Sequence, residues 1–294
     1  MRALITGING FVGTALKQSL EERGHQVFGM DIRSSGTNVH AVDISDQAAV
    51  IRCLAEVSPD SIFHLAAISR VDYNNPSIIY SINTTGTLNL LQASLKISPK
   101  PRFLLVSSSQ VYGIVPDDRQ PIDEQAPIRP VNHYGASKAA SEHISRVFHY
   151  EYDLPVIIVR PFNHIGRGQD PHFVIPKIFK AIHEHKTEIE LGELSVVRDF
   201  LDVRDVVDVY IRLMENSQAG AVYNISSGRG YRLSELFTMI QEMAHTSLTV
   251  KKIEVLLRKN EITTSIGDSS LVRNLLQWRP AYTMQDTLRW MLDS

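Results

Sequence analysis

Tyr134 and Lys138 are the two side chains whose types and spacing most directly suggest chemistry. They are four residues apart, about one helical turn, so both would project from one face of a helix over residues 133–152. A free phenol titrates near pH ~10, but a neighbouring ammonium favours the phenolate by Coulomb attraction. Ser108 lies 26 residues before Tyr134, at the end of an expected strand, and could hold a carbonyl or alcohol oxygen against the phenol. The three side chains together predict proton transfer to or from a bound oxygen.

A tyrosine four residues before a lysine is ordinary on an amphipathic helix, so the pair alone does not establish chemistry. A glycine-rich turn near the N-terminus supports the functional interpretation. Residues 2–6 form a short apolar run, followed by Gly7, Gly10 and Gly13 and then by a helical pattern. Glycines let the backbone approach a pyrophosphate, and the first N–H groups of the following helix bind its oxygens. A strand, turn and helix in this order predict a dinucleotide-binding site rather than an ordinary tight turn.

A second expected strand, over residues 26–30, leads to Asp31, which lies 18 residues past Gly13. A carboxylate at this strand end would bind the ribose hydroxyls of NAD and repel the 2′-phosphate of NADP. Arg33 is close in sequence and could attract that phosphate. We therefore expect NAD(H) to be favoured and NADP(H) to be possible.

Strand-like runs alternate with helical patterns through the first half of the chain. The runs cover residues 3–6, 27–30, 62–66, 103–106 and 156–159. This alternation predicts an α/β fold with a doubly wound parallel sheet of the Rossmann type. Continuous apolar runs are typical of strands that are covered on both faces.

The alternation of strand-like and helical patterns is lost after Pro161, which indicates a second, smaller and interleaved C-terminal substrate domain. We expect residues 1–162 to form the dinucleotide-binding domain. A helical pattern over 202–216 and an apolar run over 222–226 indicate that residues 201–226 return to that domain. Residues 163–200 and 227–294 are then expected to form mainly the substrate-binding domain.

Composition limits the possible partners. The 294 residues are 43% apolar and can bury a large core, while 30 basic and 32 acidic residues give a net charge of −2. This balance argues against nucleic acid. No apolar run reaches the length of about 18 residues needed to span a membrane, and the sequence enters the nucleotide fold at once, so we expect a cytoplasmic protein. Cys53 is the only cysteine and the 11 histidines show no metal-ligand spacing, so we expect neither a disulfide nor a metal.

Six features occur in one order along the chain. They are residues 6–13, Asp43 with Ile44, residues 64–67, Asn83 with Gly86 and Thr87, residues 108–113, and Tyr134 with Lys138. Together they resemble the extended short-chain dehydrogenase/reductase superfamily, which contains NAD-dependent epimerases, dehydratases and reductases of nucleotide sugars. The resemblance implies that Tyr134 is the acid or base, that Lys138 orients the nicotinamide ribose and that Ser108 binds the reacting oxygen.

The expected coenzyme site combines the glycine turn with positions that the resemblance implies. These are Gly7, Asn9, Gly10, Phe11, Val12, Gly13, Asp31, Arg33, Asp43, Ile44, Leu65, Ala66, Ala67, Asn83, Val106, Tyr134, Lys138 and Pro161. Most relatives in the superfamily are dimers built through the helix that bears the tyrosine and the helix before the serine strand, here about residues 76–96. We therefore expect a homodimer.

The second half of the chain narrows the resemblance. R-P-F-N-H-I-G-x-G-Q over 160–169, V-R-D-F-x-D-V-R-D over 197–205 and V-Y-N-I-S-S-G over 222–228 resemble the branch of GDP-4-keto-6-deoxy-D-mannose reductase. GDP-mannose 4,6-dehydratase is slightly less similar. The branch implies a nucleotide-diphosphate pocket formed by Asn163, Val174, Lys177, Arg198, Arg258 and Glu261, and we also expect Ser109 and Gln110 to bind substrate. Arginine suits a diphosphate because its planar fork donates two hydrogen bonds, although any single arginine here could be a surface ion pair, and Asn163 could cap a turn.

Gln110, two residues after Ser108, separates the possible reactions. Dehydratases of this superfamily carry glutamate there to remove a proton, and an amide cannot act as that base. We therefore expect NAD(P)H-dependent reduction of a nucleotide-linked 4-keto-6-deoxy sugar, GDP-4-keto-6-deoxy-D-mannose to GDP-D-rhamnose. One alternative is an NAD-dependent nucleotide-sugar 4-epimerase, which Asp31 favours. A more distant one is a catalytically inactive, cofactor-binding regulatory protein.

Overall fold

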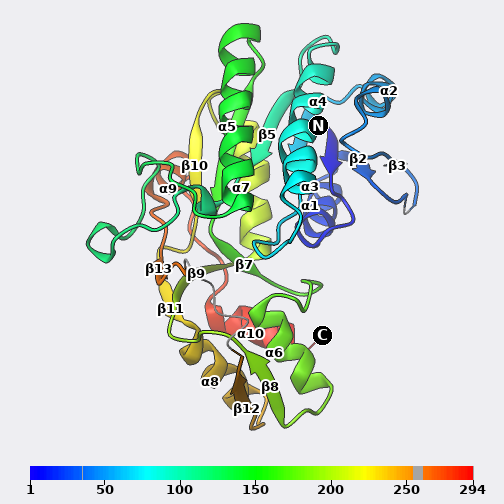
Figure 1. Ribbon diagram of the computed structural model, residues 1–294. Coiled ribbons are helices and arrows are strands. Elements are labelled where there is room, and N and C mark those ends of the chain that lie inside the picture. The colour runs from blue at the N-terminus through cyan, green and yellow to red at the C-terminus, as the bar shows by residue number, and fades with distance from the viewer. Residues whose placement is uncertain (35, 254–260, 294) are drawn as a thin grey trace.

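A seven-stranded parallel sheet forms the larger part of the molecule in a computed structural model, which describes residues 1–34, 36–253 and 261–293 (Figure 1). In chain order the strands are β1 (Arg2–Thr6), β2 (Gln26–Asp31), β3 (Val39–Ala41), β4 (Ser61–His64), β5 (Arg102–Val106), β6 (Val156–Pro161) and β10 (Val222–Ile225). The predicted doubly wound parallel sheet is confirmed. The sequence did not indicate β3, because its three residues are at least partly exposed and form no apolar run.

The order of the strands, β10-β6-β5-β4-β1-β2-β3, reverses direction at β1. Ligands of open parallel sheets bind outside the carboxyl ends of the strands at such a reversal, here between β1 and β4. Gly7 directly follows β1 and lies against Ala66, so that a Cβ built on Gly7 would be 3.0 Å from the Ala66 backbone. Its φ of 73° is also one that glycine adopts readily. The segments that follow β1 and β4 therefore pack tightly against each other where a ligand is expected.

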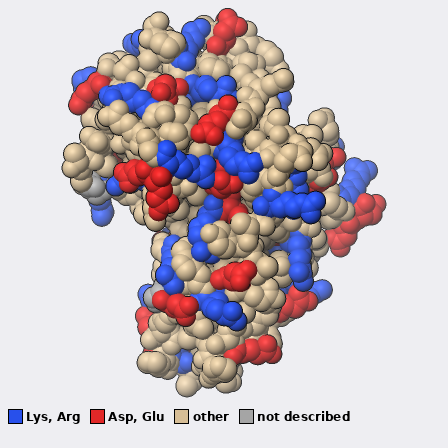
Figure 2. Space-filling model, turned by 180° about the vertical axis from the view of Figure 1, so that it is seen from behind, with Lys and Arg blue, Asp and Glu red and all other residues tan. Residues whose placement is uncertain are grey.

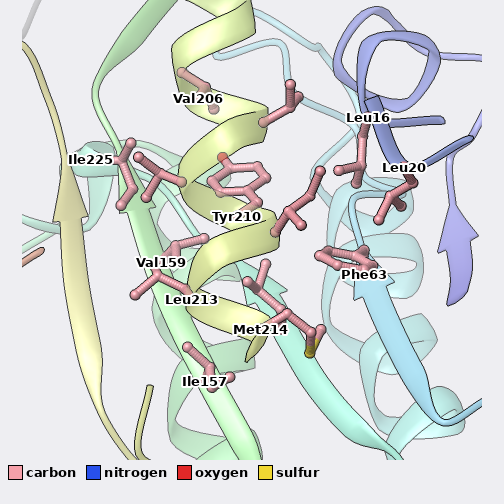
Figure 3. Packing of buried hydrophobic residues seen from close by; sticks show 14 of the residues in the cluster. Leu16, Leu20, Phe63, Ile157, Val159, Val206, Tyr210, Leu213, Met214 and Ile225 are labelled. Carbon is pink, nitrogen blue, oxygen red and sulfur yellow. The ribbon is translucent and has the colours of Figure 1, made fainter. Parts of the chain in front are cut away.

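Helices cover both faces of this sheet (Figure 1). One face carries α2 (Gln47–Val57), α4 (Gly86–Ser94) and α5 (His133–Tyr152), and the other carries α1 (Phe11–Glu22) and α7 (Val203–Asn216). Alternate strand residues serve the two cores, since Leu4 packs with the first set of helices and Ala3 and Ile5 with the second. Figure 3 shows Tyr210 and Leu213 of α7 among the apolar side chains of α1 and β6.

The helix expected over residues 76–96 is not uniform. α3 (Pro76–Tyr80) is capped by the Asn75 side chain and is followed by one π-helical turn, η1 (Ser81–Thr85), before α4 begins. Such turns are rare and occur frequently at functional sites. Here the turn carries Asn83, one of the expected site residues.

The smaller part of the molecule lies at the bottom of Figure 1. β7 (Asn163–Ile165), β9 (Val197–Asp202), β11 (Gly230–Arg232) and β13 (Thr264–Ser265) form one sheet, and β8 (Glu188–Leu191) and β12 (Thr249–Lys252) form another. Their apolar side chains share a core with α6 (Val174–His183), α8 (Leu233–Met243) and α10 (Met284–Leu292). α7 and β10 pack with the large sheet, although β9 before them and β11 after them belong to the small one. The domain limits given above stay a prediction.

The surface carries charges of both signs. Figure 2 shows Lys and Arg interspersed with Asp and Glu over the face seen from behind. Within the described ranges, none of the helices has the length and apolar character required to cross a membrane.

We expect Leu213→Ala to lower the free energy of unfolding by about 2–5 kcal/mol, because it removes contacts of a fully buried leucine and leaves a cavity. Urea unfolding followed by circular dichroism measures the change. Leu271→Ala removes the same atoms at a half-exposed position of α9 (Ser270–Leu276), and its cost should stay below about 1 kcal/mol. Equal losses in the two variants would contradict the packing of α7 under the sheet.

Candidate active site

The glycine turn after β1 has the shape that a pyrophosphate requires. α1 begins at Phe11, and its N-cap residue, Gly10, offers no side chain to the first N–H groups of the helix. A Cβ on Gly13 would lie 2.2 Å from the Gly7 carbonyl oxygen, so a larger residue would displace the turn. The positive end of α1 also has no acidic residue in its first turn. These features fit a coenzyme that contains a diphosphate.

Asp31 and Arg33 lie beside this turn. The Asp31 carboxylate accepts a hydrogen bond from the Asn9 backbone N–H at 3.1 Å, and the Asn9 side-chain amide donates to the Arg33 carbonyl oxygen at 2.9 Å. Asp31 is partly exposed and Arg33 is exposed. The carboxylate is thus held next to the glycine turn with part of its surface open, as a partner of ribose hydroxyls must be.

Asp43 and Ile44 follow β3 on the same side of the sheet. Ile44 is buried, and its carbonyl oxygen accepts a hydrogen bond from the Asn89 amide of α4 at 2.9 Å. Asp43 is exposed, and its carboxylate accepts from the N–H and the hydroxyl of Ser45 at 2.8 Å each. The fold therefore holds Ile44 in place and leaves the Asp43 side chain accessible.

Phe11 and Val12, at the start of α1, are partly buried. The Phe11 ring stacks on the ring of His164 in β7, with centroids 6.0 Å apart and planes 11° from parallel. Burial lowers the pKa of His164, so this imidazole is neutral at pH 7. The stack joins the glycine turn to the smaller part of the molecule.

Leu65, Ala66 and Ala67 follow β4, whose last residue is the buried His64. His64 Nδ1 lies 2.8 Å from the Thr6 hydroxyl, and its Nε2 lies 2.9 Å from the Thr87 hydroxyl. Because the Thr87 hydroxyl donates to a carbonyl oxygen at 2.6 Å, Nε2 must carry the proton and Nδ1 must accept. Burial lowers the pKa of His64 to about 3, so the imidazole is neutral.

Asn83, in η1, connects the loop after β4 to α5. Its side chain accepts from the Ile68 N–H at 2.8 Å and donates to the Ile68 carbonyl at 3.1 Å and to the Ser137 hydroxyl at 2.9 Å. Ser137 in turn donates to the Tyr134 carbonyl at 2.7 Å. Asn83 therefore positions the backbone that carries Tyr134.

α5 begins immediately before Tyr134. Asn132 caps this helix, since its Oδ1 accepts from the Gly135 N–H at 2.8 Å. The Nδ2 group of the same amide donates to the Gln110 side-chain oxygen at 3.0 Å. Gln110 lies in a short 3₁₀ turn, η2 (Ser109–Val111), and its N–H donates to the Ser108 hydroxyl at 3.2 Å. Gln110 thus links the Ser108 segment to the N-terminus of α5.

Tyr134, Lys138 and Ser108 meet at the carboxyl end of β5, and all three are buried. The Ser108 hydroxyl lies near enough to the Tyr134 phenol to lower its pKa. Lys138 Nζ donates to the carbonyl oxygen of Val106, the last residue of β5, at 2.8 Å. The structure therefore brings together the three side chains that sequence reasoning selected for chemistry.

The electrostatics of this group are set mainly by burial. Burial raises the pKa of Tyr134, and the nearby Ser108 hydroxyl opposes the rise. This direction is opposite to the one expected from a neighbouring ammonium alone, because desolvation disfavours the buried phenolate. Burial also lowers the pKa of Lys138 to about 8, while the Glu142 carboxylate raises it. At pH 7 the phenol retains its proton and the lysine is charged.

The residues expected to bind substrate are more widely placed. Pro161 ends β6, and Asn163 pairs with Phe200 where β7 meets β9. Val174 begins α6, and one turn later Lys177 Nζ donates to the Glu190 carbonyl at 2.5 Å.

Arg198 and Glu261 form an ion pair with a 2.7 Å contact, although 63 residues separate them. Arg198 also donates to the Val197 and Thr263 carbonyl oxygens. The structure thus brings together two of the residues expected to bind the diphosphate, and it pairs them with each other. Arg258, also expected there, lies outside the residues that the structure describes.

The loop between β5 and α5, which includes a 3₁₀ turn, η3 (Asp117–Arg119), is attached to the smaller part. The Ile122 N–H donates to the Ile266 carbonyl at 2.8 Å, and the Asp268 N–H donates to the Ile122 carbonyl at 2.8 Å. The Gln120 amide binds Thr264 and Ile266 backbone groups in the same way. This loop therefore leads from the Ser108 segment to the small sheet and back to Tyr134.

Sequence reasoning missed four buried or capping residues of this site, namely His64, Asn132, Glu142 and Arg160. Each had a local signal. His64 is a polar residue within the expected strand over 62–66, and Arg160 directly follows the expected strand over 156–159. Asn132 precedes the helix as a cap would, and Glu142 follows Lys138 by one turn.

Known proteins resemble this chain in sequence and in fold. A family profile described as GDP-mannose 4,6 dehydratase matches residues 4–291. The chain is 35% identical over 278 residues to the GDP-6-deoxy-D-talose 4-dehydrogenase of Aggregatibacter actinomycetemcomitans, covering 94% of this chain and 91% of that protein. It is 33% identical over 298 residues to the GDP-6-deoxy-D-mannose reductase of Pseudomonas aeruginosa, covering 99% of this chain and 96% of that protein.

Two solved structures show the likeness in three dimensions. RMD from Pseudomonas aeruginosa, complexed with NADPH, has a TM-score of 0.90 at 32% identity, covering 100% of this chain and 98% of that chain. The UDP-glucose 4-epimerase of Thermus thermophilus, complexed with NAD, has a TM-score of 0.91 at 27% identity, with the same coverage of 100% and 98%. The chain therefore belongs to the GDP-mannose 4,6 dehydratase family, within the extended short-chain dehydrogenase/reductases, a group of NAD(P)-dependent enzymes of nucleotide sugars.

Proposed function

We propose that this protein uses NADH or NADPH to reduce a nucleotide-linked 4-keto-6-deoxy sugar, and that it converts GDP-4-keto-6-deoxy-D-mannose to GDP-D-rhamnose. The observation that carries the proposal is a buried Ser108, Tyr134 and Lys138 group beside Gln110, an amide where dehydration needs a carboxylate. Two relatives that are named for GDP-linked 6-deoxy sugars support the nucleotide and the sugar class.

Reduction of the C4 ketone requires the protein to position the sugar and to transfer one proton. A bound nicotinamide supplies the hydride that C4 of the ketosugar accepts. Tyr134 donates its phenolic proton to the C4 oxygen, and the Ser108 hydroxyl donates a hydrogen bond to the same oxygen. The Lys138 ammonium stabilises the phenolate that remains. The raised pKa of Tyr134 supports this role, because an acid must hold its proton at pH 7 until the substrate takes it.

Gln110 argues against 4,6-dehydration. Removing a proton from carbon requires a base at this position, and the Gln110 amide oxygen instead accepts a hydrogen bond from Asn132 at 3.0 Å. The amide therefore serves to orient the start of α5.

For the nucleotide end of the substrate, we propose a pocket formed by the smaller part of the molecule. Arg198 would bind phosphate oxygens and Glu261 a ribose hydroxyl, since the two side chains already lie together. Asn163, Val174, Lys177 and Arg258 complete the proposed pocket, while Ser109 and Gln110 are proposed to contact the sugar from the segment after β5.

We also propose a homodimer formed through α5 and the helical segment over residues 76–96.

A 4-epimerase of a nucleotide sugar is the second candidate. Asp31 favours it, because a carboxylate at the ribose suits an enzyme that keeps NAD bound, and a UDP-glucose 4-epimerase is among the similar structures. Such an enzyme retains NAD during purification and turns over a UDP-sugar without added reductant.

The direct test mixes purified protein with GDP-4-keto-6-deoxy-D-mannose and either NADH or NADPH. We expect loss of absorbance at the reduced-nicotinamide band, with one equivalent of GDP-linked 6-deoxyhexose formed for each coenzyme oxidised. Proton NMR of the sugar ring distinguishes GDP-D-rhamnose from its C4 epimer, the 6-deoxy-D-talose form. Unchanged absorbance with both coenzymes would reject reduction, and the talose form would reject the proposed stereochemistry.

We expect Tyr134→Phe to lower kcat by at least about 100-fold, because the ring remains while its acidic proton is lost. NADH affinity, followed by coenzyme fluorescence, should stay within about twofold, because the phenylalanine keeps the aromatic ring and most of the expected coenzyme contacts are made by other residues. Tyr150→Phe makes the same change at a side chain that is 76% exposed on the same helix, and it should leave turnover intact. Equal activity of Tyr134→Phe and the parent enzyme would favour a binding protein without this chemistry.

We expect Asp31→Ala to shift the coenzyme preference toward NADP(H) by about tenfold, measured as the ratio of the two dissociation constants. Removing the carboxylate abolishes its repulsion of the 2′-phosphate and its hydrogen bonds to the ribose. The loss of its contact with the Asn9 N–H affects both coenzymes alike and cancels in the ratio. Asp118→Ala, at an exposed position, is the control. An unchanged ratio would remove Asp31 from the determinants of preference.

A further inference from the structure

Glu142 is a fully buried carboxylate on α5, one turn after Lys138. Its Oε1 accepts a hydrogen bond from the Ser107 hydroxyl at 2.5 Å. Arg160 of β6 donates to it through two nitrogens, Nε to Oε1 at 3.0 Å and Nη2 to Oε2 at 2.7 Å. One side chain thus connects α5 with the residue after β5 and with β6.

Ser107 lies between Val106, whose carbonyl binds Lys138, and Ser108, whose hydroxyl is proposed to bind the reacting oxygen. The carbonyl of Val106 before it accepts from Lys138 Nζ at 2.8 Å, and Ser108 follows it. The Ser107 N–H is held by the Val159 carbonyl at 2.8 Å. The hydroxyl bond from Ser107 to Glu142 therefore fixes the backbone on which both the lysine contact and the serine hydroxyl depend.

Arg160 is held on its other side as well. Its Nη1 donates to the Tyr112 hydroxyl at 3.0 Å and to the Glu124 carbonyl at 3.2 Å, and its guanidinium carbon lies 5.0 Å from the centre of the Tyr112 ring. The Tyr112 hydroxyl itself donates to the Asn224 side-chain oxygen at 2.7 Å. A buried ion pair of this kind can often be replaced by apolar residues without loss of stability, so stability alone does not require it.

We propose that Glu142 and Arg160 are positioning residues that hold Ser108 and Lys138 in one arrangement and set the electrostatic field at the Lys138 ammonium. The consequence for catalysis rests on the proposed reduction, whereas the effect on Lys138 is a property of the protein alone. The two residues carry opposite charges, so the proposal requires that their removal act on Lys138 in opposite directions.

The ionisable groups around Lys138 leave Glu142 as the source of negative charge. Tyr134, on the same helix, is protonated at pH 7 because burial raises its pKa. His64 of β4 is neutral, since burial lowers its pKa to about 3. Glu142 raises the pKa of Lys138 against the effect of burial, and the same carboxylate accepts hydrogen bonds from the positively charged Arg160.

The test is a titration of Lys138 in the protein without coenzyme. Lysine labelled with ¹³C at Cε gives a resonance for each side chain, and the signal of Lys138 is the one that Lys138→Arg removes. In the parent protein its pKa is about 8. Glu142→Gln should lower it by about one pH unit, since Arg160 is left unpaired, and Arg160→Met should raise it by a similar amount. A merely structural loosening would move both variants in the same direction.

Three further variants keep the proposal open to refutation if a single charge deletion does not fold. Arg160→Lys retains the charge and should titrate like the parent. Glu142→Gln combined with Arg160→Met removes both buried charges and should give a value between those of the single variants. Ser107→Ala leaves both charges and should keep the titration while lowering kcat by about tenfold with little change in KM.

The pH dependence of kcat provides the second readout, with its alkaline limb at lower pH in Glu142→Gln and at higher pH in Arg160→Met. A Lys138 titration that stays at the parent value in every folded charge-changing variant would overturn the proposal. If the parent protein does not turn over the ketosugar, the proposed function fails, and the titration still decides whether this pair controls Lys138.

Discussion

The hydrogen bond from the Lys138 ammonium to the Val106 carbonyl is the contact on which the site depends. It joins helix α5 to the end of strand β5, and the positions of the other two side chains proposed for catalysis depend on that attachment. Tyr134 lies one turn earlier on the same helix, and Ser108 lies two residues beyond Val106. Burying an ammonium without a hydrogen-bond acceptor costs free energy, so the Val106 carbonyl stabilises Lys138 in its buried position. The same hydrogen bond fixes the end of β5 against α5. Helix and strand are thereby kept in one relative position.

Burial determines how these groups ionise. Desolvation keeps the Tyr134 proton in place, brings the pKa of Lys138 down to about 8 and leaves His64 neutral. Glu142 and Arg160 form an ion pair in the same environment, in which two guanidinium nitrogens donate to the two carboxylate oxygens. The site therefore combines a neutral acid with a cation whose charge is maintained by a carboxylate one turn away. That combination suits the delivery of a proton to a ketone oxygen.

The two expected ligand sites differ in what forms them. The expected coenzyme site is formed largely by backbone, through the glycine turn, the Gly7 and Ala66 contact and the uncapped start of α1. The expected nucleotide-sugar pocket is formed by side chains such as Arg198 and Glu261 on small strands and loops. Side chains can change without disturbing the sheet, which is why proteins of similar fold act on different sugars and bases.

The local sequence pattern was enough to predict most of the helices and strands around the site and to select the three side chains that we propose for catalysis. The helix predicted over 133–152 coincides with α5, and the five strands of the first half appear in the expected places, because apolar periodicity and caps are local properties. The spacing of Tyr134 and Lys138 is equally local. Three features became visible only in the folded structure: the pairing of Glu142 with Arg160, the π-helical turn that contains Asn83, and the rise of the Tyr134 pKa. These depend on desolvation and on contacts between different elements, and neither can be read from the spacing of residues along one helix or strand.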